Sequence, residues 1–488
     1  MINMNDTTTI VRTRFAPSPT GFLHVGGLRT ALYNYLFARH HQGQFILRIE
    51  DTDRTRYVEG AIENLIRTLH LMGIHYDEGP DGGGPHAPYL QSQRTDLYQR
   101  YAQALIKKRE AYYCFCTAER LAKMRKEQEN AQKQPKYDGT CRNLSPEIVK
   151  QNLHKGINRV IRLKMPQTGE TVFNDLIRGE VRIQNELTDD QILIKSDGYP
   201  TYHLANVIDD HLMKVTHVIR GEEWLLSVPK HLRLYQAFGW QPPQMAHLPL
   251  LLNPDRSKLS KRQGDVAVED FLKKGYLPEA LINFVALLGW NPGIDQEIFS
   301  MEELIQLFTL ERVNKAGAVF DLQKLNWMNA FYLKQMDEKK RVRFLRPFLQ
   351  EAGYDISDEN KAKKIIDAVY KRISFGKEIA REAAIFYEPD LEIQEQEARM
   401  ILRQESSKKV LATLLEKIRD VPELDVESFK NLMKQVQQET GIKKEQLWMP
   451  VRVALTGVTH GPELPLVIDI FGKKKITSFL TKALELAG

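Results

Sequence analysis

The sequence is poor in the features that mark secreted and membrane proteins. Its 488 residues include only three cysteines, which argues against a disulfide framework and for a reducing compartment. No apolar run approaches the roughly 20 residues that a membrane-spanning helix needs, and there are no repeats or low-complexity tracts. The first residues, MINMNDTTT, are polar and lack the apolar region of a secretory signal. We therefore expect a cytoplasmic protein without a membrane partner.

The length favours a chain of several domains, and the net charge bears on its partners. At the usual domain size, 488 residues make three or four domains, and 42% hydrophobic with 27% charged residues is ordinary for globular proteins. The net charge of +6 permits a polyanionic partner without identifying one.

One stretch, residues 13–43, reads as a strand, a proline-rich loop and a helix. His24, Gly26 and Gly27 then lie at the helix start, where unpaired backbone N–H groups attract phosphates. Glycine permits close approach, and the His24 imidazole can donate to phosphate oxygens that gain negative charge during a displacement. The alternative for so short a motif is an ordinary capped turn, so a second phosphate-binding element is needed.

That second element is the polar, turn-forming run NPDRSKLSKRQGD at residues 253–265, which follows the apolar HLPLLL. Lys258 and Lys261 flank Ser260 in this run. A flexible basic loop of this kind can close over a triphosphate.

At this point the sequence resembles a known family. HVGG at 24–27 and KLSKR at 258–262 resemble the HIGH and KMSKS motifs of class I aminoacyl-tRNA synthetases. Four further segments resemble bacterial glutamyl-tRNA synthetases, and the likeness runs nearly end to end: PSPTG, RIEDTD, DGYPTYHLANVIDD and VIRGEEW.

The resemblance implies an ATP-dependent ligase that joins L-glutamate to tRNA. A glutamate carboxylate attacks the α-phosphate of ATP, with Mg²⁺ bridging phosphate oxygens, and the glutamyl group then passes to the 3′ end of tRNA(Glu) for protein synthesis. Residue by residue, the match assigns catalysis to His24 and Lys261. Contacts to ATP fall to His24, Gly26, Gly27, Glu223, Lys258, Ser260 and Lys261.

A site for glutamate must neutralise two carboxylates and one ammonium, and Arg14, Arg220 and Glu50 supply that complement. The planar fork of arginine suits a carboxylate. Glu50 ends the apolar run 44–50, which we expect to be a buried parallel strand whose carboxyl end faces the ligand crevice of an open α/β sheet. Arginines that only solvate a surface are the alternative. The family match assigns glutamate binding to Arg14, Ala16, Ser18, Glu50, Tyr202, Asn206, Arg220 and Trp224.

Spacing adds detail around two of these segments. Tyr202 and Asn206 are four residues apart and would share one face of a helix, whereas we interpret His203 as a half-buried core residue. Asp51 and Asp53 either face the crevice or cap the next segment.

The predicted fold is α/β, with a Rossmann-type catalytic domain, an inserted α+β domain and an all-α C-terminal region. We expect the catalytic domain at 10–110 and 197–250, the inserted domain that grips the tRNA acceptor end at 111–196, a connecting helical domain with the KLSKR loop at 251–333, and helical anticodon-binding domains at 334–488.

The cysteines leave a zinc site open. All lie in the inserted region, at a spacing that matches a zinc site in part of the family: Cys114, Cys116 and Cys141. The fourth ligand there is a histidine, but the matching residue here is Asn143, a poor zinc ligand. Either Tyr137 or His154 replaces it, or three free thiols remain of a lost site.

The C-terminal region has basic residues where the family approaches the anticodon, notably Lys371, Arg372 and Lys377. Arg452 either contacts tRNA or caps a helix. Basic helical faces are usually solvated surface, so this assignment rests on the resemblance. We expect a monomer.

Other protein classes share parts of this pattern. Glutaminyl-tRNA synthetases share the front half but end in β-barrels, a truncated relative that modifies a tRNA base is too short, and small-molecule adenylyltransferases need neither insertion nor tail. A catalytically silent tRNA-binding paralogue is the rival of another class. The sequence leaves open whether tRNA(Gln) is also charged.

Overall fold

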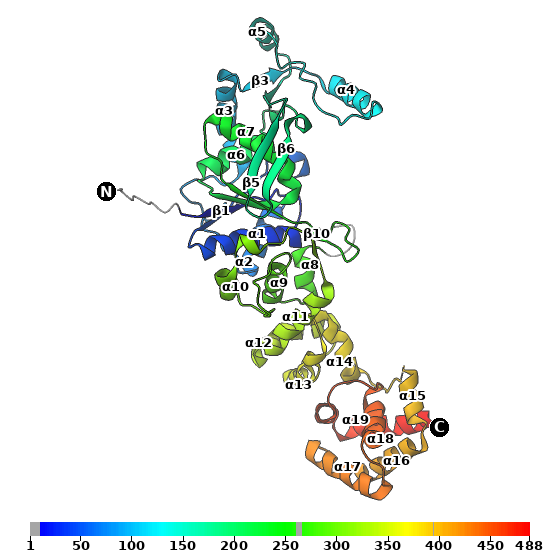
Figure 1. Cartoon of the computed structure of the whole chain (residues 1–488). Helices are drawn as coiled ribbons and strands as arrows, with labels where there is room; N and C mark the ends of the chain where they lie inside the picture. The colour runs from blue at the N-terminus through cyan, green and yellow to red at the C-terminus, as the bar shows by residue number, and fades with distance from the viewer. Residues whose placement is uncertain (1–9, 260–265, 394) are drawn as a thin grey trace, which may run out of the picture. The chain divides into compact units, whose positions relative to one another are not determined.

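The computed structural model describes residues 10–259, 266–393 and 395–488, and it divides into two compact units (Figure 1). Unit 1 comprises Met1–Phe271 and Leu281–Leu322, and unit 2 comprises Leu272–Ala280 and Gln323–Gly488. Ser260 and Lys261, which the sequence predicts to contact ATP, lie outside the described residues.

Unit 1 begins with the predicted strand, loop and helix. Strand β1 (Arg12–Phe15) pairs in parallel with β2 (Gln44–Leu47), and helix α1 (Val25–His40) connects them. The chain after β2 keeps hydrogen bonding to its neighbours, since the Glu50 N–H donates to the Pro17 carbonyl at 2.9 Å. Glu50 is therefore held beside the loop that follows β1. Helices α2 (Ala61–Leu71) and α3 (Thr95–Lys107) complete this half.

The second half supplies another pair of parallel strands, β8 (His217–Gly221) and β9 (Gln244–Leu248), with helices α6 (Tyr202–Leu212) and α7 (Val228–Phe238). β1 and β8 are neighbours, because the Thr216 N–H donates to the Arg12 carbonyl at 2.9 Å. The carboxyl ends of β1 and β8 thus lie at one edge, where open α/β folds bind ligands.

The region predicted as an insertion contains a separate antiparallel sheet of order β3-β4-β7, formed by β3 (Ala111–Cys114), β4 (Val160–Leu163) and β7 (Ile192–Ile194). Two helices accompany it, α4 (Ala118–Asn130) and α5 (Pro146–His154). The hairpin of β5 (Glu170–Asp175) and β6 (Gly179–Gln184) instead joins the catalytic sheet, in the order β6-β5-β9-β8. The domain borders at 111 and 196 stay predictions.

Short elements fill the rest of the chain up to residue 319. They are η1 (Arg54–Arg56), η2 (Gln91–Arg94), η3 (Asn185–Leu187), η4 (Glu222–Ser227), β10 (Leu251–Leu252), α8 (Val268–Lys274), α9 (Pro278–Ala286), α10 (Met301–Leu307), η6 (Leu310–Arg312) and β11 (Ala318–Val319).

Every element of the described residues from Leu322 onward is a helix, as the sequence predicts (Figure 1, yellow-green to red). These helices are α11 (Leu322–Gln335), α12 (Glu338–Glu351), α13 (Glu359–Val369), η7 (Tyr370–Arg372), η8 (Gly376–Glu378), α14 (Ile379–Tyr387), α15 (Gln396–Leu402), α16 (Glu405–Arg419), α17 (Val426–Thr440), α18 (Glu445–Thr456) and α19 (Leu464–Ala487). The apolar faces of α12 to α19 bury one another in a single core.

Within the described parts of the chain, we find no helix that combines the length and the apolarity needed to cross a bilayer.

Candidate active site

A cleft of about 600 Å³ opens at the carboxyl ends of β1 and β8 in unit 1. Its wall includes the start of α1, the start of α6, and the residues on both sides of the lysine loop. Thirteen residues that the sequence nominates for binding line this one cleft: Arg14, Ala16, Ser18, His24, Gly26, Gly27, Glu50, Tyr202, Asn206, Arg220, Glu223, Trp224 and Lys258. Their individual roles stay predictions.

His24 is the N-cap of α1, and its imidazole has a fixed orientation. Nδ1 accepts a hydrogen bond from the Gly27 N–H at 3.1 Å. Because Nδ1 accepts, the proton of the neutral ring is on Nε2, which is the nitrogen able to donate. A Cβ at Gly26 would lie 3.1 Å from the His24 ring, and one at Gly27 would lie 2.8 Å from Leu23 Cδ1. Gly26 therefore makes room for the His24 cap and Gly27 for Leu23, a reason that the sequence does not reveal.

The lysine loop is anchored next to this helix start. The Val25 N–H donates to the Val266 carbonyl and the Val268 N–H donates to the Leu23 carbonyl, both at 2.9 Å, and His24 forms a β-bridge with Ala267. Lys258, on the other side of the loop, lines the same cleft. The two ends of the described chain around residues 260–265 therefore both lie at the His24 end of the site.

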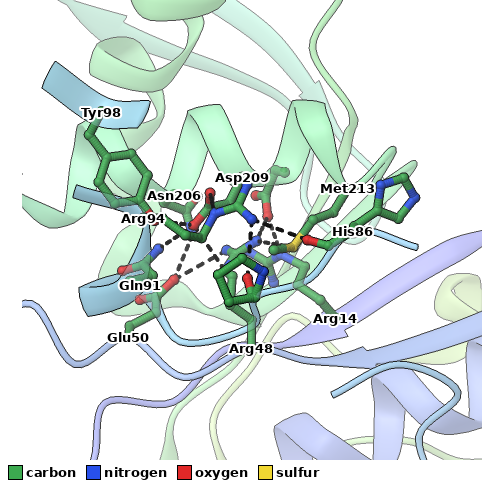
Figure 2. A network of polar contacts seen from close by, with 12 residues as sticks. Arg14, Arg48, Glu50, His86, Gln91, Arg94, Tyr98, Asn206, Asp209 and Met213 are labelled. Atoms are coloured by element: carbon green, nitrogen blue, oxygen red, sulfur yellow. Dashed lines mark hydrogen bonds and ion pairs between the residues drawn. The ribbon is translucent and has the colours of Figure 1, made fainter. Parts of the chain in front are cut away.

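Glu50 is 7% exposed and lines the cleft, and Figure 2 shows its polar contacts. Its Oε1 accepts hydrogen bonds from Asn206 at 3.1 Å and from Arg48 at 3.2 Å. Burial raises the pKa of the Glu50 carboxyl, although the charge of Arg48 opposes this. The positive charge of a substrate ammonium would lower the same pKa, so binding such a group favours the ionised form.

Behind Glu50 lies a buried ionic network that sequence reasoning missed (Figure 2). Arg48 is fully buried and contacts Asp210 at 2.8 Å and Asp209 at 3.9 Å, and Arg14 Nε donates to Asp210 at 3.1 Å. Burial lowers the pKa of Arg48, but the charges of Asp210, Asp209 and Glu50 outweigh burial and raise it. RIEDTD contains Arg48 and VIDD contains Asp209 and Asp210, but a sequence cannot show that the two segments meet.

Arg220 is 5% exposed and lines the cleft from the end of β8. Its Nη1 donates to the Tyr202 hydroxyl at 2.9 Å, and the Tyr202 ring packs on Trp224 with 4.3 Å between centroids. Tyr202 and Asn206 both line the cleft, as the helical spacing predicts. Two buried histidines, His231 and His247, also contact Arg220, and no motif or spacing in the sequence points to either.

Glu223 and Gly221 form a tight pair at the start of η4. A Cβ at Gly221 would lie 2.1 Å from Glu223 Oε2, so the carboxylate takes its place only because residue 221 has no side chain. Glu223 lines the cleft beside residues 249–251.

The three cysteines converge in the inserted region. The ligand atoms of Cys114, Cys116 and Cys141 all lie within 4.8 Å of one another. The Tyr137 hydroxyl lies 3.4 Å from Cys114 Sγ and 3.6 Å from Cys116 Sγ. Among the residues that the structure describes, His154 is not part of this group. Of the two substitutes considered from the sequence, the structure therefore places Tyr137 at the cluster.

Of the basic residues that the sequence nominates in unit 2, Arg372 and Arg452 form hydrogen bonds within that unit, whereas Lys371 is exposed. Arg372 forms an ion pair with Glu382 at 2.7 Å and bonds to the carbonyls of His460 and Gly461. Lys371 is exposed. Arg452 Nη1 donates to the Pro462 carbonyl at 2.8 Å, in the segment before α19. Anticodon contacts of Lys371 and Arg372 stay predictions.

The open α/β sheet and the cleft at the carboxyl ends of its strands define a class of protein, which a comparison with family models names. The family model described as "tRNA synthetases class I (E and Q), catalytic domain" matches residues 10–327, and the model "Anticodon binding domain" matches residues 340–484. The predicted fold class is thereby confirmed, from the catalytic domain to the helical C-terminal region.

Relatives narrow the class further. The chain is 48% identical to a glutamate–tRNA ligase of Alkaliphilus metalliredigens, covering 96% of this chain and 97% of that protein, and 49% identical to one of Clostridioides difficile, covering 95% and 97%. It superposes with a TM-score of 0.88 and 41% identity on a crystal structure of a glutamate tRNA ligase from Elizabethkingia meningosepticum in complex with its amino acid, covering 97% and 99%. The chain belongs to the glutamate–tRNA ligase family.

Proposed function

We propose that this chain activates L-glutamate with ATP and transfers the glutamyl group to the 3′ end of tRNA(Glu), as an ATP-dependent aminoacyl-tRNA synthetase of the cytoplasm. The supporting observation is that one cleft brings together the His24 helix start, both ends of the lysine loop, and the set of Arg14, Glu50 and Arg220. The first two suit a triphosphate, and the last suits one ammonium and two carboxylates.

In the first step, a substrate carboxylate oxygen attacks the α-phosphorus of ATP and pyrophosphate leaves. His24 Nε2–H and the Lys261 ammonium would donate to phosphate oxygens as negative charge develops there. Glu50 would hold the ammonium of glutamate, and the two arginines its carboxylates. Mg²⁺ would arrive with ATP and neutralise phosphate charge.

In the second step, the ribose hydroxyl of the terminal adenosine of tRNA attacks the activated carbonyl and AMP leaves. The inserted region would grip the acceptor end, and the helices of unit 2 would approach the anticodon. We propose that the active species is a monomer.

Pyrophosphate release tests this function against a silent tRNA-binding paralogue. With tRNA(Glu) present, we expect release with glutamate, and at most about a hundredth of that rate with glutamine or no amino acid, because Arg14 and Arg220 select for a second carboxylate. Release that is independent of the amino acid would contradict the proposal. Charging assays with tRNA(Glu) and tRNA(Gln) then define the tRNA range.

We further propose that the cysteine cluster holds one structural Zn²⁺. Three sulfur ligands within 4.8 Å fit the preference of zinc for thiolates, and the Tyr137 hydroxyl offers a fourth ligand. Hydrogen bonding with Cys141 lowers the pKa of Cys114, which favours the thiolate that a metal needs. The ion would tie β3 to the segment around residues 137–141.

Metal analysis tests this site. We expect about one zinc per chain in protein purified without chelator, as four-ligand structural sites hold one ion. Cys116→Ser should lose the metal, while Tyr137→Phe should keep it but release it faster to a chelator. Wild-type protein that binds no zinc would leave three free thiols instead.

A further inference from the structure

Arg220 differs in its partners from Arg14, which also lines the cleft, and from Arg48, which lies in the buried network behind Glu50. Arg14 and Arg48 each contact Asp210. In the described parts of the chain, by contrast, no carboxylate forms an ion pair with Arg220, although its side chain is almost fully buried. A buried charge without a counter-ion is costly. The contacts that Arg220 does make must therefore explain why it is tolerated.

The first of these contacts fixes the protonation of His247. Arg220 Nε donates to His247 Nε2 at 3.1 Å. Arginine is only a donor, so His247 Nε2 carries a lone pair and the ring proton is on Nδ1, which donates to Asp175 Oδ2 at 2.6 Å. Asp175 in turn is held by the backbone N–H groups of Ile177 and Arg178, each 3.0 Å from Oδ1.

The second contact fixes His231 in the same way. Arg220 Nη1 lies 3.3 Å from His231 Nδ1, so Nδ1 is the acceptor and Nε2 carries the proton. His231 Nε2 lies 3.1 Å from His203 Nδ1, which accepts that proton in a hydrogen bond. Both rings that contact Arg220 are therefore neutral.

Burial supports this assignment. His231 and His247 are 2% and 0% exposed. Desolvation lowers the pKa of both, with the positive charge of Arg220 as a further cause, and lowers the pKa of His203 to about 3. The neutral forms are thus the ones that persist near neutral pH.

We propose that the two neutral imidazoles of His231 and His247 position Arg220 while leaving its charge uncompensated for a carboxylate of the amino acid substrate. This inference rests on the proposed function, and it makes both histidines positioning residues. A carboxylate partner would hold the guanidinium equally well, but it would compete with the substrate, because its ion pair would have to weaken before the substrate could bind. Neutral acceptors avoid that competition. The remote carboxylate of Asp175 acts only through the imidazole that it orients.

The test compares two variants of nearly equal shape. In His231→Asn, the amide oxygen can take the place of Nδ1 as a neutral acceptor. In His231→Asp, a carboxylate oxygen takes the same place. Both variants leave the same space and lose the same contact with His203, so their difference isolates the charge that faces Arg220.

We expect kcat/KM for glutamate to fall about tenfold in His231→Asn, because one acceptor is weakened, and on the order of 100-fold further in His231→Asp. The further loss should appear mainly in the KM for glutamate, while the KM for ATP stays within about threefold. A merely structural role would affect the two variants alike and would not separate the two substrates. Equal values of kcat/KM for the two variants would overturn the proposal.

A second pair guards against misfolding. In the double variant Asp175→Asn with His247→Glu, the negative charge moves from residue 175 to residue 247, next to Arg220, and the total charge is unchanged. The double variant Asp175→Asn with His247→Gln is its neutral control. We expect the same ordering: kcat/KM for glutamate should be about 100-fold lower in the double variant with His247→Glu than in the one with His247→Gln. Should the wild-type chain not release pyrophosphate with glutamate and tRNA at all, the proposed function fails; should it do so while both pairs show no difference, only the present inference fails.

Discussion

Replacing Arg48 by methionine is expected to lower the stability of the protein by about 3–5 kcal/mol, because removal of one member leaves buried carboxylates without a counter-charge. Arg48 is 0% exposed and contacts Asp210, Asp209 and Glu50. Methionine keeps much of the volume, so the loss reflects charge rather than a cavity. The midpoint of urea unfolding measures the effect.

The matched control is Arg182→Met. Arg182 contacts Glu170 and Glu180 at 2.6 and 2.8 Å, but its side chain is 54% exposed. Exposed ion pairs contribute about 0–1 kcal/mol, so little change is expected. Equal shifts of the unfolding midpoint in the two variants would show that the buried network does not depend on Arg48.

Lys261→Ala is expected to slow tRNA-dependent ATP–pyrophosphate exchange by a factor on the order of 100 or more, as the loss of one preorganised donor to a developing charge does. Binding of tRNA should stay nearly intact, since the changed group would face the triphosphate. Exchange with labelled pyrophosphate, measured with tRNA present, and tRNA binding measured separately give the two quantities.

Lys273→Ala is the control for this prediction. Lys273 is an exposed lysine of α8, twelve residues further along the chain, and it does not line the cleft. The same change of charge there should leave exchange within about twofold of the wild-type rate. Unchanged exchange in Lys261→Ala would remove this lysine from the mechanism.

Much of the site could be predicted because the binding segments are local. The strand, loop and helix at the start of the chain are set by prolines, glycines and apolar spacing, and the structure places His24 at the N-cap, as predicted. The strand predicted at 44–50 is shorter in the structure, where β2 ends at Leu47. Beyond it the chain bonds alternately to two neighbours, which a periodic pattern cannot reveal.

The support behind the site could not be predicted. Arg48 and Asp210 are 162 residues apart, and Asp175 and His247 are 72 apart, so their contacts exist only once distant segments of the chain have packed together. Asp175 lies in the region predicted as an insertion, yet its strand pairs with β9 of the catalytic sheet. Buried polar residues of this kind look, in a sequence, like ordinary surface charges.

By itself, the sequence determined thirteen of the residues that line the cleft, the helical nature of the C-terminal region and the family, because those depend on short motifs and on periodicity. The tertiary structure alone decided the electrostatic state of these residues. Arg14 is held by a carboxylate and Arg220 by neutral imidazoles, and that difference arises from which distant side chains burial brings together, since a pKa and a tautomer depend on neighbours in space rather than along the chain.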